Sequence, residues 1–584
     1  MRLALANLAL FLVLAAPKAT AQQEAVGPRI IVEKNVQARM RDGVILRADV
    51  YRPGTSTRLP ALLQRTPYSK NPNREDNVFR RMAERGYVVV VQDTRGRYMS
   101  DGVARPHDEA EDGFDTIEWV AALPYVNGRV GMFGTSYSAT TQLMAAPLRP
   151  PHLVALAPAS SYNSRYDMVF QGGAFYIADG LNWNIGQAAD VRRRRTQPEV
   201  NRDGSIGMSA TERQSLNDWL RHMPLKTVAV PDLREHAPGY FTMLDHPSYD
   251  DYWRIFDIES RHHQVEVPAL HLTGWYDALL NGTVRNFAGL RAHARTAKAR
   301  EGQRLIVGPW THSGPTARTT TIGTVDYGSA AGLDSDSLRF AWFDYWLKDT
   351  PTGVLSRAPV RLFIMGANIW RDEQEWPLAR AVPTLFYLHS AGGANSLAGN
   401  GTLNRDAPGA EPPDRFAYDP NNPVPTGARG GYSRSPSDQR EVEQRTDVLV
   451  YTSAPLETPL EVTGPILTHL WVTSTATDTD FTVKLVDVLP DGTARALTDG
   501  ILRARYRKSK FSPVPLTPNQ PEELTIDAGA TGNVFLPGHR IRIEISSSNF
   551  PRFDRNPNTG APFGEGPPAR SAQQTVLHDR LHPS

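Results

Sequence analysis

A serine within a run of small residues is the feature of this sequence with the clearest chemical potential. In the segment 130–142 an apolar stretch ends at Gly134, Ser136 follows after one residue, and a helix-compatible segment continues. This order predicts a strand, a sharp turn and a helix, with the Ser136 hydroxyl lifted clear of the sheet. Ser138 stands where such turns usually carry a second glycine. Since ordinary strand-to-helix turns can show the same pattern, the rest of the chain must decide.

Two residues downstream could activate this serine. A serine hydroxyl needs a base to accept its proton, and the base needs a partner that fixes its tautomer. Asp277 follows a predicted strand at 269–275, and His312 follows the next one at 303–310. The order serine, acid, histidine, each after a strand, is that of α/β-hydrolases, so we expect a catalytic triad of Ser136, Asp277 and His312. Taken singly, Asp277 could be a helix cap, and most of the 15 histidines have no catalytic role.

A serine hydrolase also needs donors for the negative oxygen of its tetrahedral intermediate. The turn at Ser136 places the main-chain N–H of Tyr137 beside that oxygen. We expect the second donor in the loop after the strand 59–65, where the phenol of Tyr68 is available. Tyr68 alone could equally be a packing residue beside Pro67.

Composition restricts the classes of function. The chain has 584 residues, a formal charge of +2 and no cysteine, which predicts several globular domains without disulfides or thiolate metal sites. The densest basic cluster, 192–195, reads as a solvated helix face, so we expect no nucleic-acid partner. Residues 1–21 have the basic start, apolar run and small-residue end of a signal peptide. We therefore expect a periplasmic or secreted bacterial protein without a membrane span after cleavage.

The order of predicted elements indicates the fold class. Strands alternate with helices up to about residue 160 and again from 263, as in an α/β sheet. The intervening segment lacks strand runs, and the last third shows short alternating strands with a long surface loop at 405–444. We expect a signal peptide at 1–21, an α/β-hydrolase domain at 22–160 and 263–358, an inserted helical cap at 161–262, and a C-terminal jelly-roll domain at 359–584.

Several motifs together resemble the cocaine esterase/X-Pro dipeptidyl-peptidase family, which includes α-amino acid ester hydrolases and glutaryl-cephalosporin acylases. They are RTPY (65–68), DTRGR (93–97), GTSY (134–137), GWYD (274–277), GPWTH (308–312), DTDF (478–481), RARYR (503–507) and SSSNFPRF (546–553). The resemblance covers nearly the whole mature chain. It implies a hydrolase domain, a cap and a jelly roll, with Ser136, Asp277 and His312 as the triad and Tyr68 with the Tyr137 amide as the oxyanion hole. It also allows a homo-oligomer.

One departure from this family bears on specificity. In the α-amino acid ester hydrolases we expect an aspartate near the position that Lys70 occupies here. That aspartate would belong to a cluster of carboxylates that binds the ammonium group of the substrate. A lysine there would repel that group. Other acidic residues could take the place of this aspartate, although each could also be a surface charge or a helix cap. They are Glu75, Asp76, Asp245, Asp250 and Asp251.

We therefore expect a secreted serine hydrolase that cleaves an ester or amide of a small acyl substrate through an acyl-enzyme, with no cofactor and no metal. One alternative is an X-Pro dipeptidyl-peptidase, which would need an anionic anchor for a free amino terminus. The other is a carbohydrate-binding protein with an inactive hydrolase domain. Aromatic cap residues could line the acyl pocket or form the core of the cap; they are Tyr162, Tyr166, Phe170, Phe175, Tyr176, Trp183 and Trp253.

Overall fold

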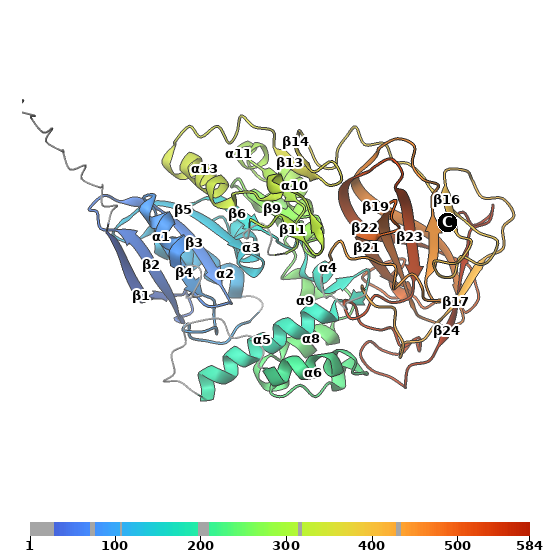
Figure 1. Cartoon of the computed structure of the whole chain (residues 1–584). Coiled ribbons are helices and arrows are strands. Elements are labelled where there is room, and N and C mark those ends of the chain that lie inside the picture. Colours follow the sequence, from blue (N-terminus) through green and yellow to red (C-terminus); the bar gives the residue numbers. More distant parts are fainter. Residues whose placement is uncertain (1–28, 71–75, 106–107, 197–209, 313–317, 428–433) are drawn as a thin grey trace, which may run out of the picture.

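The computed structural model describes residues 29–70, 76–105, 108–196, 210–312, 318–427 and 434–584. The predicted signal peptide and Glu75 lie outside these residues. The chain forms an α/β region, a helical cap beside it and a β-rich C-terminal region at the opposite end of the molecule (Figure 1). No helix among the described residues is both long and apolar enough to cross a bilayer.

The α/β region is built on one ten-stranded sheet, which confirms the predicted class. Its central strands are parallel, whereas the first two and the last strand run antiparallel to their neighbours. In spatial order the strands are β1 (Ile30–Arg39), β2 (Ile45–Pro53), β4 (Val88–Asp93), β3 (Leu59–Thr66), β5 (Val126–Thr135), β6 (Leu153–Ala159), β9 (Leu270–Gly274), β10 (Arg304–Gly308), β13 (Val360–Ile364) and β14 (Ile369–Glu373).

Helices cover both faces of this sheet, which explains the uninterrupted apolar strand β4. Val88 and Val90 pack in the core beneath α2 and α3, whereas Val89 and Val91 pack on the opposite face beneath α1 and α13. A strand buried on both faces needs apolar residues at every position. The helices of this region are α1 (Asp76–Glu84), α2 (Asp108–Ala121), α3 (Tyr137–Ala145), α10 (Leu280–His293), α11 (Ala297–Glu301) and α13 (Ser335–Lys348).

The cap is helical, with one difference from expectation. A two-stranded hairpin of β7 (Phe170–Gln171) and β8 (Ala174–Phe175) interrupts it. The strands are too short to leave an alternating pattern in the sequence. The cap helices are α4 (Arg165–Val169), α5 (Ile177–Thr196), α6 (Ala210–Leu220), α7 (Leu233–His236), α8 (Gly239–Asp245) and α9 (Asp251–Arg254).

The C-terminal region contains two sheets that share one apolar core. The first consists of β15 (Tyr387–His389), β16 (Thr402–Asn404), β18 (Leu449–Thr452), β23 (Arg540–Ser546), β20 (Asp480–Val488) and β21 (Ala494–Arg503). The second consists of β17 (Asp414–Tyr418), β24 (Ala572–Leu577), β19 (Leu460–Ser474) and β22 (Glu522–Phe535). The region is β-rich as predicted, and the jelly-roll strand order stays a prediction.

The domain boundary at residues 358 and 359 stays a prediction. The two strands that follow it, β13 and β14, extend the large sheet, because β13 pairs in parallel with β10. The segment 405–444 is not simply a surface loop, since it contains β17 and buries Asp414 and Gln439. Polar residues suggested exposure there, but both side chains have buried partners elsewhere in the C-terminal region.

A buried charge cluster ties the end of β24 to β17. His578 Nε2 lies 2.9 Å from Asp414 Oδ2, and its Nδ1 lies 3.3 Å from Glu411 Oε2. Tyr451 and Ser390 also donate hydrogen bonds to Asp414. Burial lowers the pKa of His578, but the hydrogen bonds and charges of Asp414 and Glu411 raise it by more, so its pKa stands above the ordinary value.

This cluster predicts a pH-dependent stability. A histidine whose folded pKa is raised stabilises the protein fully below its unfolded pKa of about 6.5, and this contribution is lost as the pH rises through the folded pKa. We expect His578→Gln to lower the free energy of unfolding by about 3 kcal/mol at pH 6, and by less at pH 9. The melting temperatures of both proteins at the two pH values measure this, with His582→Gln, at a partly exposed histidine, as the control. An equal loss at both pH values would contradict the prediction.

Candidate active site

The turn between β5 and α3 has the strained backbone that the sequence predicts. Ser136 has φ 62° and ψ −124°, outside the regions that most residues adopt. Gly134 has φ 144°, and a Cβ at this position would lie 2.6 Å from the Cβ of Ser138. Ser138 is therefore accommodated because Gly134 has no side chain. The N–H of Ser136 donates to the carbonyl of Ala159 at 2.9 Å, which ties the turn to β6.

The other two predicted triad residues meet beside this turn. Asp277 comes three residues after the end of β9, and His312 comes four residues after the end of the neighbouring parallel strand β10. Adjacent parallel strands end at the same edge of a sheet, so the two loops lie side by side. Asp277 Oδ1 lies 2.9 Å from His312 Nδ1.

The environment of Asp277 keeps its carboxyl group ionised. Asp277 is fully buried, and it accepts hydrogen bonds from Thr273 Oγ1 at 3.1 Å and from the N–H of Leu279 at 2.9 Å. Burial raises the pKa of Asp277, but the charge and hydrogen bond of His312, together with hydrogen bonds from Ser160 and the N–H of Leu279, hold the pKa below its usual range. The carboxylate can therefore orient the imidazole and stabilise its protonated form.

His312 is poised to accept a proton. Its side chain is 37% exposed, in contrast to Asp277. Burial lowers the pKa of His312, but Asp277 and, more weakly, Asp179 raise it above the ordinary value. The Ser136 hydroxyl forms no hydrogen bond with His312; it lies 3.4 Å from the phenol oxygen of Tyr68. Catalytic hydrogen bonds often tighten only when substrate binds, so this geometry is compatible with general-base catalysis.

The two predicted oxyanion donors converge on Ser136. Tyr68 lies two residues after the end of β3, and Tyr137 is the first residue of α3, where main-chain N–H groups have no partner within the helix. Burial raises the pKa of Tyr68, and hydrogen bonds with Ser136, Trp183 and the main chain of Tyr137 lower it by less. The phenol therefore stays protonated near neutral pH and can donate a hydrogen bond to an oxyanion.

Glu109 and Trp183 contact the side chain of Tyr137 from two sides. Neither contact was predicted from the sequence. The Tyr137 hydroxyl donates to Glu109 of α2 at 3.2 Å, and the Tyr137 ring stacks on Trp183 of α5 with 6.0 Å between centroids. Glu109 in turn is paired with the buried guanidinium of Arg65. Nothing in the sequence around Glu109 marks it, because its partners come from β3 and α3.

The structure overturns the expected role of Lys70. Its side chain is buried, with Nζ 3.2 Å from Asp93 Oδ2 and 3.8 Å from Asp49 Oδ1. Two carboxylates therefore compensate its charge, and Lys70 is no longer a reason to exclude a cationic substrate.

The acidic residues named as substitutes are not gathered at the site. Asp245 pairs with Lys226, Asp250 caps α9 and contacts His246, and the exposed Asp251 pairs with Arg254. The side chain of Asp76 lies outside the described part of the structure. Within that part, no three His, Asp or Glu side chains are placed to hold a metal ion.

Asp179, which was not among the residues predicted from the sequence, also lies near the reactive groups. It lies in the first turn of α5, one turn before Trp183, and is close enough to His312 and Tyr68 to raise the pKa of each. Burial raises the pKa of Asp179, while His312 and Arg165 lower it by less. The structure records no hydrogen bond or ion pair for its carboxyl group with any described residue. The sequence carries no local signal for this placement.

Five of the seven aromatic cap residues fall into two groups, while Tyr162 contacts Met144 of α3 and Tyr176 packs against Phe553. Trp183 contacts Tyr137 and Tyr68 and therefore borders the site. Four others contact one another in the core of the cap, as the alternative interpretation predicted; they are Tyr166, Phe170, Phe175 and Trp253.

Comparison with known families gives two matches that together cover most of the chain. Residues 42–314 match the X-Pro dipeptidyl-peptidase (S15 family) model. Residues 352–584 match the model of the X-Pro dipeptidyl-peptidase C-terminal non-catalytic domain.

Individual relatives extend over nearly the full length. The cocaine esterase of Rhodococcus sp. (strain MB1 Bresler) is 38% identical over 549 residues, which cover 91% of this chain and 93% of the esterase. A crystal structure of an aminopeptidase from a marine sediment Thaumarchaeota archaeon has a TM-score of 0.82 and 27% identity and covers 95% of both chains. An α-amino acid ester hydrolase structure has a TM-score of 0.81 and 26% identity, covering 97% of this chain and 98% of its own.

The geometry of the turn predicts a paired mutational effect. We expect Gly134→Ala to reduce kcat by at least about 100-fold, because the new Cβ clashes with Ser138 and displaces the turn. Adding Ser138→Gly removes the closest atom, the Cβ of residue 138, and should recover part of the activity. The main-chain O and C of residue 138 still lie 3.0 and 3.1 Å from the new Cβ, and φ 144° remains unfavourable for alanine. Steady-state kinetics of the three variants measure this. Ser138→Gly alone should be close to wild type, and a double variant no better than Gly134→Ala would contradict the prediction.

Proposed function

Since the chain belongs to the family of cocaine esterase and the X-Pro dipeptidyl-peptidases, we propose that it is a serine esterase that cleaves a small acyl substrate through an acyl-enzyme. The observation that carries the proposal is the 2.9 Å contact between Asp277 and His312 beside the strained turn at Ser136. This arrangement supplies a nucleophile, a base and a group that orients the base.

In the proposed mechanism Ser136 Oγ attacks the carbonyl carbon of the substrate while His312 Nε2 accepts the hydroxyl proton. Asp277 holds the Nδ1–H of the imidazole through the hydrogen bond seen in the structure. Tyr68 and the N–H of Tyr137 donate hydrogen bonds to the oxyanion of the tetrahedral intermediate. Its collapse releases the alcohol or amine, which takes the proton from His312. Water, activated by the same histidine, then hydrolyses the acyl-enzyme.

One feature supports a further part of the proposal. Residues 1–21 have the composition of a signal peptide, so we infer export to the periplasm or the medium. The substrate is a small ester or amide, and a homo-oligomer stays a prediction from the family resemblance. The carbohydrate-binding alternative has no support of its own, whereas Asp277 and His312 have the contact that catalysis requires.

Asp179 suggests a second candidate function, in which the enzyme acts on substrates with a free amino group. The peptides cleaved by a dipeptidyl-peptidase are substrates of this kind. The sequence offered no anionic anchor for an ammonium group. Asp179 carries a carboxyl group beside His312 and Tyr68, and no described residue neutralises it through an ion pair. A cationic group on the substrate would find a partner there.

Removal of the nucleophile and of one oxyanion donor tests the mechanism. We expect Ser136→Ala to lower kcat for a p-nitrophenyl ester by a factor on the order of 10⁶ and Tyr68→Phe to lower it by about 100-fold to 1,000-fold. Tyr387→Phe in the C-terminal region is the control and should keep full activity. Circular dichroism and melting temperatures establish that each variant is folded. A folded Ser136→Ala protein with wild-type turnover would rule out the mechanism.

A matched pair of substrates tests the role of Asp179. We expect kcat/KM for an α-amino acid ester to exceed that of its N-acetylated counterpart, and Asp179→Asn to reduce this preference by about tenfold. Because Asp179 raises the pKa of His312, the same variant should shift the acid limb of the pH profile of kcat/KM to lower pH. The control is Asp218→Asn, an exposed charge on cap helix α6. Wild-type preference for the acetylated ester would exclude amine recognition while leaving the esterase mechanism intact.

A further inference from the structure

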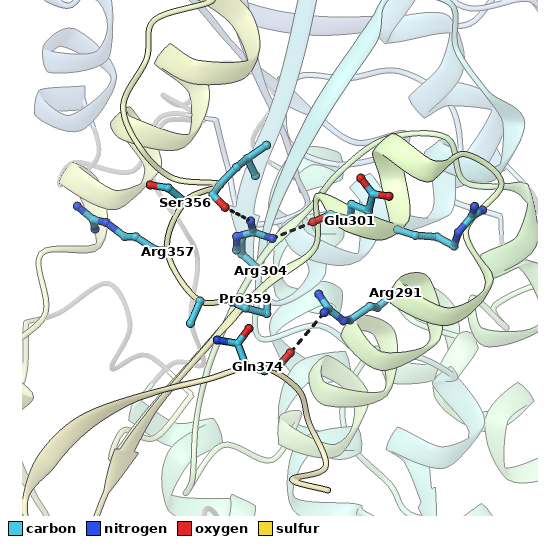
Figure 2. A pocket seen from close by; sticks show the side chains of 10 residues that line it. Arg291, Glu301, Arg304, Ser356, Arg357, Pro359 and Gln374 are labelled. Atoms are coloured by element: carbon cyan, nitrogen blue, oxygen red, sulfur yellow. Dashed lines mark hydrogen bonds between the residues drawn. The ribbon is translucent and has the colours of Figure 1, made fainter.

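A cavity lines the large sheet at the strand ends opposite to those that carry the proposed active site. It has a volume of ≈ 550 Å³ and is bordered by α10, α11, the loop before β13 and the residue after β14 (Figure 2). Arg304, the first residue of β10, lines it, whereas His312 follows the other end of the same strand. The two sites are therefore separated by the length of a strand through the sheet.

Four arginines line this cavity: Arg291, Arg300, Arg304 and Arg357. Across the described residues, the structure records no ion pair between any of the four and a carboxylate. Arginines elsewhere in the molecule are commonly matched, as Arg95 is by Asp42 and Asp112. The one acidic residue in the lining is Glu301. Among the described lining residues, the cavity therefore gathers four positive charges against one negative charge.

Arg304 provides a buried and rigidly held charge. Its side chain is bonded to main-chain carbonyls only: Nε to Val354 at 3.2 Å, Nη1 to Glu301 at 2.9 Å and to Gln303 at 2.8 Å, and Nη2 to Leu355 at 3.1 Å. The residue is 9% exposed. Carbonyl oxygens orient a guanidinium but carry no net charge. Burial and the charge of Arg291 both lower the pKa of Arg304, which shows that the two cations oppose each other.

The remaining arginines retain donors for a ligand. A guanidinium has five N–H groups. Arg291 uses one of them for the carbonyl of Gln374 at 3.3 Å, and Arg300 uses one for the carbonyl of Ala294 at 2.7 Å. The structure records no hydrogen bond from Arg357 to a described residue. Planar guanidinium groups match the paired oxygens of phosphate and carboxylate.

We propose that this cavity binds a small anion with several phosphate-type negative charges. The observations that carry the proposal are the four guanidinium groups without carboxylate partners, the buried position of Arg304 and the free donors around one hollow. A cavity of ≈ 550 Å³ is larger than a single phosphate requires and lies in the range of sites for small organic ligands. The proposal does not depend on the proposed esterase function.

Calorimetric titration of the full chain with inorganic pyrophosphate tests the site. We expect binding that weakens with added salt, because screening reduces interactions between charges. Arg291→Gln and Arg357→Gln should each raise Kd by about tenfold, and Glu301→Gln should lower it. The matched control is Arg285→Gln on the same helix α10, at an arginine paired with Asp527 outside the cavity. Arg291 and Arg357 both reach solvent, so these variants should fold.

A parallel measurement separates the two sources of such a phosphate. Vesicles containing phosphatidic acid are compared with pyrophosphate in the same buffer. If the protein binds pyrophosphate and Arg291→Gln weakens this binding, the ligand is a soluble phosphate. If the protein binds the vesicles and Arg291→Gln weakens that binding, the ligand is a lipid headgroup. No binding of either probe, or equal affinity in Arg291→Gln and Arg285→Gln, would overturn the proposal. Ser136→Ala should bind as the wild type does, which keeps this result independent of the esterase activity.

Discussion

The left-handed backbone at Ser136 is the constraint on which the rest of the site depends. A non-glycine residue in such a conformation costs about 1–3 kcal/mol and persists only where the surroundings hold it. Here β5 lies between β3 and β6, and α3 packs back onto the same strands. The N–H of Ser136 is bonded to Ala159, so the turn cannot relax without breaking the pairing with β6. The buried sheet therefore keeps the hydroxyl in position.

The C-terminal region supports the loop that carries Asp277. Trp275 is fully buried, and its Nε1 donates to the carbonyl of Phe363 at 2.7 Å. Gly532 of β22 lies against this indole so closely that a Cβ there would be 2.7 Å from a ring atom. Gly274 approaches the carbonyl of Trp310 in the neighbouring loop in the same way. The contact of Gly532 with Trp275 packs the β-rich region directly against the loop that carries Asp277, so this region belongs to the architecture of the site.

Positively charged side chains have carboxylate partners at one end of the sheet strands and, in the described part of the chain, lack them at the other. Near Ser136 the buried cation Lys70 is matched by Asp93 and Asp49, so the field at the site is set by groups such as Asp179. At the opposite strand ends, arginines line a hollow without carboxylate partners. Only Arg304 among them is buried, and a buried charge without a counter-charge is costly. The lack of carboxylate partners among the described residues distinguishes these arginines from paired ones such as Arg95.

Features that depend on neighbouring residues could be predicted from the amino-acid sequence. Apolar runs and glycines predicted the strands, the turn at Ser136 and the loops that carry Asp277 and His312, and the structure places these two in contact. Four features became visible only in the folded chain: the ion pairs of Lys70, the position of Asp179 beside His312, the extension of the large sheet by β13 and the burial of Asp414. Each of these depends on partners far away in the chain, and a local pattern specifies a residue's own conformation but not which distant charge or strand will meet it.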